Sequence, residues 1–192
     1  MMSRKISLQL KDKSSIGAFC LRLRPQNWQR FQAAEAELDG VLPRQPRTLH
    51  QIGKFRALCL GPDEWWLFGS AVDITKTVQK LEPVFSDGAA HAINMTAGWP
   101  AIGLSGPALP NFLCKVSRSG SDLASMQNPG GRRISIAGIK IIATKEFDKS
   151  SKAHSTIFVP RSYMPIVKQH VQHLAKSVRE PVLFTQQTPP PV

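Results

Sequence analysis

Residues 55–68, with the sequence FRALCLGPDEWWLF, contain two short apolar runs separated by Gly61-Pro62-Asp63. Glycine and proline together are typical of a tight turn, and short apolar runs beside such a turn are typical of strands. The segment therefore predicts a β-hairpin. Trp65 and Trp66 must point to opposite faces of its second strand. One tryptophan is expected in the core. The other either faces outward as an interface anchor or is buried by a second layer, loops or helices.

The pattern on either side of this hairpin alternates between strand and helix. Apolar runs predict strands at residues 16–23, 89–95, 100–105 and 154–159, and two β segments that turn at Gly138 within residues 132–143. Helices are predicted from Asn27 through Leu38 with a stop at Gly40, from Asp73 through Leu81, and from Gly106-Pro107 through Val116. Residues 41–54 and 117–131 are expected to be loops, and residues 144–153 to be solvated.

The longest predicted helix follows Pro160-Arg161-Ser162. Its apolar stripe contains Tyr163, Ile166, Val167, His170, Val171, Leu174 and Val178. Strands and helices that alternate, with hairpins among them, favour the α+β class: mixed or antiparallel sheets with packed helices. Each half holds strands followed by a helix, which favours a two-lobed molecule, although no sequence repeat is visible. We expect an N-terminal arm at residues 1–15, one two-lobed domain at 16–180 and a Pro-rich tail at 181–192.

The composition is that of an ordinary globular domain: 192 residues, 42% hydrophobic and 20% charged. No run of 18 apolar residues is present, so no membrane association is predicted. The first residues lack the apolar region of a signal peptide, and we expect a cytoplasmic protein. Cys20, Cys59 and Cys114 are widely separated among apolar neighbours, which favours reduced core thiols over a zinc site.

The net charge is +12, with 13 basic and 9 acidic residues in 1–96 and 12 basic and 4 acidic residues in 97–192. Such a field attracts nucleic acid, anionic lipid or an acidic protein partner. Specific nucleic-acid binding is disfavoured, because the basic β segment has no aromatic side chain on which a base could stack. The residues concerned are Arg132, Arg133 and Lys140, followed by Lys145, Lys149 and Lys152, with Phe147 and Phe158 as the nearest aromatics.

A search for catalytic motifs finds no phosphate-binding loop, dinucleotide fingerprint, zinc-protease helix or nucleophile elbow. His170 and His173 share a predicted helix, but without further ligands they are better explained as a partly buried and a surface histidine. His50, His91 and His154 are isolated. Asp63 and Glu64 are adjacent acids that we expect on a solvated turn. We therefore assign no catalytic, cofactor-binding or metal-binding residue in this chain.

Three segments in order resemble one family: ALCLGPDEWWL at residues 57–67, IGLSGPALPNFLCK at 102–115 and IFVPRSY at 157–163. The chain is similar, over about residues 50–178, to the gamma subunit of heterotetrameric sarcosine oxidase. The resemblance implies the fold of the folate-binding aminomethyltransferase (T-protein) of glycine cleavage. It also implies a complex that oxidatively demethylates sarcosine to glycine and, with tetrahydrofolate, gives 5,10-methylenetetrahydrofolate and hydrogen peroxide.

The resemblance further implies larger alpha and beta flavoprotein subunits and a small delta subunit as partners. FAD, FMN, NAD, tetrahydrofolate and zinc are expected in those partners, with no cofactor in this chain. Gamma would then act in assembly and stabilisation, and Arg161 would pair either with a partner carboxylate or within its own helix neighbourhood.

The chain departs from the family pattern at residues 94–99 (NMTAGW), where relatives often have Asp-x-Ser-x-x-Arg, and at residues 116–123 (VSRSGSDL). The amine oxidised therefore stays open. One alternative is the gamma subunit of a related secondary-amine enzyme such as N-methylglutamate dehydrogenase. Another, of a different class, is a stand-alone folate-binding protein of the aminomethyltransferase type.

Overall fold

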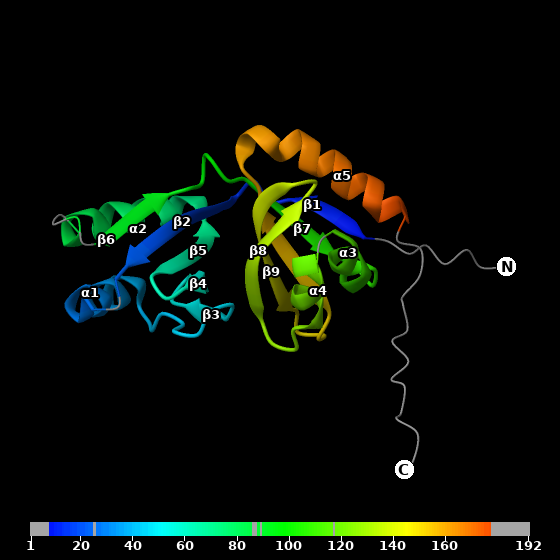
Figure 1. The fold of residues 1–192 in the computed structure, drawn as a ribbon. Helices are drawn as coiled ribbons and strands as arrows, with labels where there is room; N and C mark the ends of the chain where they lie inside the picture. The colour runs from blue at the N-terminus through cyan, green and yellow to red at the C-terminus, as the bar shows by residue number, and fades with distance from the viewer. Residues whose placement is uncertain (1–7, 25, 86–87, 89, 117, 178–192) are drawn as a thin grey trace, which may run out of the picture.

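The computed structural model describes residues 8–24, 26–85, 88, 90–116 and 118–177. Over these residues the chain forms two five-stranded antiparallel sheets (Figure 1). The strand order of the first sheet is β3 (Leu49–Ile52), β4 (Phe55–Gly61), β5 (Glu64–Ser70), β2 (Ile16–Leu23) and β6 (Ala90–Asn94). The order of the second is β8 (Gly130–Ile136), β9 (Ile139–Phe147), β10 (Ala153–Phe158), β7 (Ala101–Ser105) and β1 (Gln9–Asp12).

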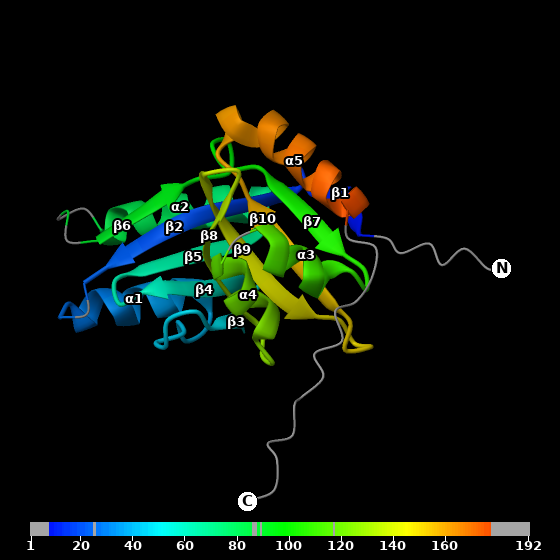
Figure 2. The ribbon, with the colours of Figure 1, turned by 45° about the vertical axis from the view of Figure 1, so that its right-hand side comes forward.

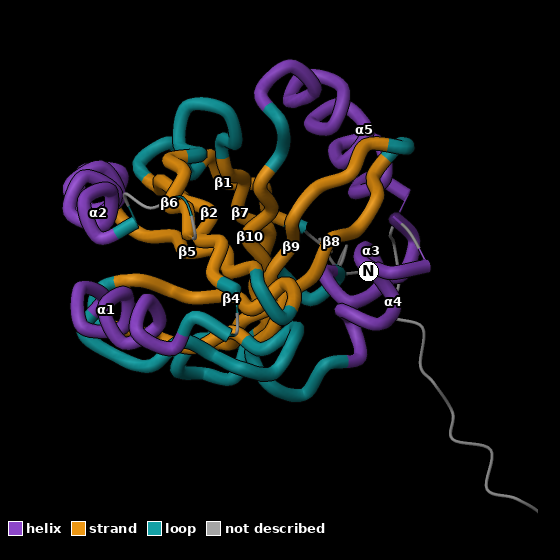
Figure 3. Tube along the Cα trace, turned by 60° about the vertical axis from the view of Figure 1, so that its left-hand side comes forward, coloured by secondary structure: helices purple, strands orange, loops and turns teal. Residues whose placement is uncertain are grey.

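Helices cover the outer face of each sheet, so that the molecule has four layers (Figure 3). Those on the first sheet are α1 (Trp28–Leu38) and α2 (Ala71–Val84). Those on the second are α3 (Leu109–Val116), α4 (Arg118–Ser125) and α5 (Met164–Ser177), which follows the short 3₁₀ turn η1 (Arg161–Tyr163); Figure 2 shows them from the side. One apolar cluster lies under each set of helices, and a third lies between the sheets. None of the described helices is long and apolar enough to cross a membrane.

The two sheets have matching topology, since β3-β4-β5-β2-β6 corresponds position by position to β8-β9-β10-β7-β1. The edge strand of the second sheet comes from the start of the chain, where β1 pairs with β7. Residues 9–12 of the expected N-terminal arm therefore form a strand. The expected tail at residues 181–192 lies outside the described residues, and the domain boundaries stay a prediction.

The predicted fold class, α+β with antiparallel sheets and packed helices, is confirmed. The strand at residues 16–23 and the hairpin at 55–68 are present, with a register shift between Cys59 and Gly61. The helix at residues 28–38 begins as predicted: Asn27 Oδ1 accepts a hydrogen bond from the Arg30 amide at 3.4 Å. It ends at Leu38 as predicted, but Asp39 rather than Gly40 takes the left-handed conformation that closes the helix.

Several local predictions are wrong. Residues 41–54 contain β3, residues 117–131 contain α4, and the N-cap of α2 is Ser70, with Asp73 in the first turn. The strands predicted at residues 89–95 and 100–105 are present as β6 and β7, which lie in different sheets. Tyr163 and Ile166, assigned to the buried stripe of the last helix, are 47% and 52% exposed, and Val167 and Val171 carry its packing. Val178 lies outside the described residues.

Residues 144–146 were expected to be solvated, and the structure buries all three. Thr144 and Glu146 face the first sheet, whereas Lys145 faces α4. The Lys145 ammonium donates to the carbonyls of Ala124 at 2.5 Å and Met126 at 2.7 Å. The polar atoms of this strand are thus paired within the protein, which is the condition for burying them.

Candidate functional site

Glu64 lies at the contact between the two sheets, at the first position of β5. The Gly61–Asp63 turn ends β4, and the chain returns with Glu64 opposite Arg22 of β2. Because side chains alternate along β5, Glu64 shares the inner face of the sheet with Trp66, while Trp65 packs under the helices. The position buries the Glu64 side chain, of which 9% is exposed.

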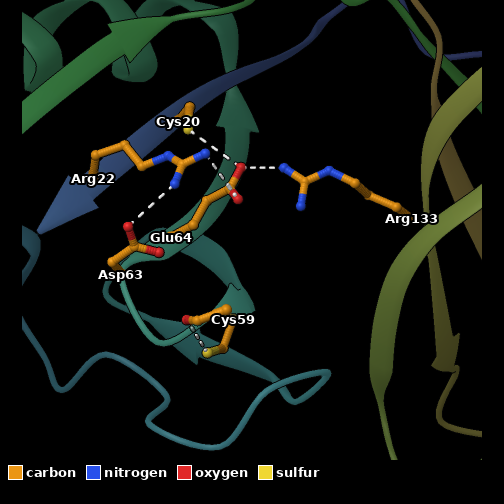
Figure 4. A network of polar contacts seen from close by, with 7 residues as sticks. Cys20, Arg22, Cys59, Asp63, Glu64 and Arg133 are labelled. Atoms are coloured by element: carbon orange, nitrogen blue, oxygen red, sulfur yellow. Dashed lines mark hydrogen bonds and ion pairs between the residues drawn. The ribbon is translucent and has the colours of Figure 1, made fainter.

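Two guanidinium groups hold the Glu64 carboxylate (Figure 4). Arg133 reaches Oε1 from β8 of the second sheet, and Arg22 Nη2 lies 3.2 Å from Oε2. Arg22 also lies 3.3 Å from the Asp63 carboxylate. Glu64 is therefore the acidic member of an ion pair that joins the two sheets.

The Cys20 thiol lies beside this ion pair and donates to Glu64 Oε1 at 3.8 Å. Burial, followed by the Glu64 charge, raises the pKa of Cys20. Burial also raises the pKa of Cys59, whose thiol donates to the Gly61 carbonyl at 3.2 Å. Because the thiolate is the nucleophilic form, these two cysteines are suited to packing rather than to covalent chemistry.

A second ion pair joins the sheets, with the opposite polarity. Arg56 of β4 lies 2.7 Å from Glu146 of β9, so here the first sheet supplies the cation. The Lys13 ammonium donates to the Thr156 hydroxyl at 3.1 Å nearby. Burial lowers the pKa of Lys13, and the Glu146 charge opposes that shift. The two reciprocal pairs fix the relative position of the sheets.

Aromatic side chains fill the space between the sheets. Trp66 packs edge-on against Trp99 at 5.4 Å and against Phe158 at 5.6 Å between ring centroids, and Phe68 lies 5.1 Å from Phe158. Trp66 and Phe158 are buried. Both Trp65 and Trp66 are therefore covered, and the alternative of an outward-facing anchor at this pair is wrong.

The other residues singled out in the sequence lie apart from this contact. Within the described ranges, His, Cys, Asp and Glu side chains form no group of three that could hold a metal ion. His173 is exposed and His170 half-buried on α5, as predicted, while His50 and His91 are exposed and His154 is half-buried. Cys20, Cys59 and Cys114 are free thiols, as expected; Cys20 and Cys59 are buried in the core, whereas Cys114 is only half-buried.

Two sequence interpretations change, and the third residue, Arg161, follows one of its two alternatives. Glu64 was expected on a solvated turn and is instead buried in an ion pair. Arg133, weighed as a nucleic-acid contact, is its partner. Arg161 donates to the Ala97 carbonyl of its own chain, which agrees with the local alternative for that residue. The signal for Glu64 was present in the alternation with Trp66 and Phe68, but its partner lies 69 residues away and no local pattern identifies it.

No protein-family model matches the sequence, and no curated protein is similar to it in sequence. Solved structures do match the fold. A chain of the heterotetrameric sarcosine oxidase from Corynebacterium sp. U-96 superposes with a TM-score of 0.77 at 15% identity, over 94% of this chain and 89% of that chain. This protein has the sarcosine oxidase chain's fold. Aminomethyltransferase T of the glycine cleavage system from Bartonella henselae matches with a TM-score of 0.64 at 12% identity.

The two matches differ in extent. The sarcosine oxidase chain and this chain cover one another almost end to end, so they are of nearly equal length. The superposition on the aminomethyltransferase includes 91% of this chain but only 47% of that enzyme, so this chain spans about half of the enzyme's length. The expected relation to the aminomethyltransferase fold is confirmed, and this chain corresponds to one part of that larger enzyme.

Proposed function

We propose that this chain is the small, non-catalytic gamma subunit of a cytoplasmic heterotetrameric sarcosine oxidase, and that it acts in assembly and stabilisation. The observation that carries the proposal is the mutual coverage of 94% and 89% with a chain of such an enzyme. The three motif segments found in the sequence support it independently of the fold.

The interior of the molecule agrees with a structural role. The carboxylate at the contact between the sheets is engaged by Arg22 and Arg133, and the middle of that contact is packed with rings. Under the proposal, larger alpha and beta subunits and a small delta subunit hold FAD, FMN, NAD, tetrahydrofolate and zinc. Those chains carry the oxidation, in which sarcosine, tetrahydrofolate and O₂ give glycine, 5,10-methylenetetrahydrofolate and hydrogen peroxide.

The test is affinity purification of the tagged full-length chain from its native cell, read by native mass and visible absorbance. A yellow complex with three further chains is the expected result. A colourless monomer would overturn the proposal. Turnover of sarcosine and of N-methylglutamate by the purified complex then separates sarcosine oxidase from the related dehydrogenase.

The folate-binding alternative is favoured by the second structural match. It predicts that the isolated chain binds tetrahydrofolate. The intrinsic fluorescence of the four tryptophans gives a direct titration signal. Saturable binding to a monomer would favour the alternative over the subunit role, whereas a four-chain complex whose isolated gamma chain shows no response would favour the subunit role.

A further inference from the structure

Trp28 is the first residue of α1, the helix that lies at the outer end of the first half (Figure 1), and it is exposed. Its side chain is 58% exposed, although the tryptophans of β5 are buried. Trp28 lines two hollows, one of about 460 Å³ and one of about 660 Å³. The first is lined by Trp28, Phe31, Arg44, Pro62 and Trp65, and the second by Trp28, Arg24, Gln26, Asn27 and Gln29. We call these lining residues the Trp28 surface.

The neighbours of Trp28 hold the ring in place. Asn27 caps α1 and so orients its first turn. The Arg44 guanidinium lies 5.7 Å from the centroid of the Trp28 ring and 4.3 Å from that of Phe31, and an ion pair of 2.7 Å with Glu35 orients it. The Trp65 indole donates to the Pro43 carbonyl at 2.7 Å, which fixes the loop carrying Arg44. The surface is therefore preorganised, which lowers the entropic cost of binding.

The charge of the Trp28 surface indicates the chemistry of its partner. Among the described residues that line the two hollows, the charged ones are Arg24 and Arg44, in a chain with a net charge of +12; the Arg44 guanidinium is paired with Glu35 outside the lining. The remaining polar groups are the amides of Gln26, Asn27 and Gln29, which can bond to a peptide backbone. Tryptophan and arginine are the residues enriched in binding hot spots. Nucleic-acid affinity comes largely from phosphate contacts, about 6–10 of them in strongly salt-dependent complexes, and two arginines supply few.

We propose that the Trp28 surface is where this chain docks an acidic segment of a larger subunit, with an apolar side chain against the Trp28 ring and carboxylates at Arg24 and Arg44. The inference rests on the proposed function, because it takes the partner to be a chain of that complex. It adds the position of the contact and the charge of the partner segment.

The experiment compares variants of the full chain in the complex purified from native cells. Dilution of each complex, followed by native mass measurement, gives the concentration at which this chain dissociates. We expect Trp28→Ala to weaken association roughly 30-fold, the size of a hot-spot truncation. Arg24→Glu should weaken it about 10-fold and make association less sensitive to salt.

Two variants serve as matched controls. Tyr163→Ala removes another exposed aromatic side chain, on η1, and Lys140→Glu makes the same change in charge on the exposed side of β9. Each should change the dissociation concentration by less than about 2-fold. Unfolding midpoints measured by circular dichroism show whether each variant is folded. A Trp28→Ala chain with a wild-type midpoint that associates as tightly as Tyr163→Ala would overturn the docking proposal.

A photo-crosslinking residue at the exposed position Gln29 identifies the occupant. Cross-links to a segment rich in Asp and Glu in a larger subunit are expected. Cross-links to a second copy of this chain or to a basic segment, or dissociation of the complex on nuclease treatment, would contradict the proposal. If wild-type chain forms no complex, the proposed function itself fails. If it forms the complex and only the variants show no effect, the docking surface alone is wrong.

Discussion

Glu64 is the residue whose setting differs most from the one its sequence neighbours predict. It follows Gly61-Pro62-Asp63, a stretch typical of exposed turns, yet only 9% of its side chain is exposed and it forms ion pairs with two arginines. Asp63, one residue earlier, is 49% exposed and contacts only Arg22 among the ion pairs of the described chain. Two adjacent acids on one turn therefore contribute differently to stability.

We predict that Glu64→Gln lowers the free energy of unfolding by about 1–2 kcal/mol, since it leaves both arginines against a neutral amide. The loss stays below the roughly 3–5 kcal/mol of a fully buried broken pair, because water reaches the partner guanidinium groups. Arg22 and Arg133 are 45% and 47% exposed. Urea denaturation near neutral pH measures the difference. The control Asp63→Asn should cost less than about 1 kcal/mol, and equal losses would contradict this reading.

The ion pair of Asp73 with Lys54 should make the stability of the protein depend on pH. A hydrogen bond of 2.5 Å from the Lys54 ammonium lowers the pKa of Asp73 below its ordinary value of 3.8. Because the folded pKa lies below the unfolded one, the stabilisation is fully present above about pH 4 and is lost as the pH falls through the folded pKa. Thermal unfolding of wild type and Asp73→Asn should therefore differ near neutral pH and converge in acid. In the Lys54→Met background the difference should shrink, and a difference that persists would exclude Lys54 as the cause.

At the scale of elements, the sequence predicted those that carry their own apolar pattern. The strand at residues 16–23 is buried along most of its length, and Phe31, Ala34 and Leu38 of the helix at residues 28–38 are buried, although Trp28 on the same apolar pattern is exposed. α4 was missed because residues 118–125, RSGSDLAS, are rich in serine and glycine, which local propensity assigns to loops. Leu123 of α4 is buried in the core, and Lys145 of β9 donates hydrogen bonds to the carbonyls of Ala124 and Met126 at the end of α4. Tertiary contacts therefore stabilise this helix.

The contact between α3 and α4 gives a prediction for Gly120. A Cβ built there would lie 1.9 Å from the Leu113 carbonyl oxygen, so any side chain must push the two helices apart. We expect Gly120→Ala to lower the free energy of unfolding by about 2–3 kcal/mol, the range of overpacked cores. Gly98→Ala is the control, because its nearest contact is 3.8 Å away, and it should be close to neutral. Equal melting temperatures of the two variants would show that α4 tolerates displacement.

At the scale of the whole molecule, the matching topology of the two sheets could not be predicted from local sequence patterns. The sequence indicated strands followed by a helix in each half. However, the edge strand of the second sheet is β1, which comes from the start of the chain and precedes all the strands of the first sheet. The same limit applies to the site: Arg133 and Glu64 are each visible as charged residues, and only the packing of the two sheets makes them partners. Contacts of this range depend on the arrangement of complete layers, which a single sequence does not encode locally.

That packing predicts that the two halves unfold together. Phe158 joins them, since its ring lies against Trp66 and Phe68 of the first sheet, whereas its neighbour Ile157 faces the helices of its own half. Both are buried, and each alanine substitution should cost about 3–4 kcal/mol. Their effects on cooperativity should differ, because only Phe158→Ala removes contacts between the halves.

Two probes distinguish these effects in urea. The four tryptophans all lie within residues 28–99, so fluorescence reports on the first half and on the segment that leads from β6 to β7. Circular dichroism reports on both halves. The two transitions should coincide in the wild type and in Ile157→Ala, where the contact between the sheets is intact. In Phe158→Ala they should separate, with the tryptophan signal and the dichroism changing at different urea concentrations. Coincident transitions in Phe158→Ala would mean that the ion pairs Glu64–Arg133 and Arg56–Glu146 suffice to keep the halves one cooperative unit.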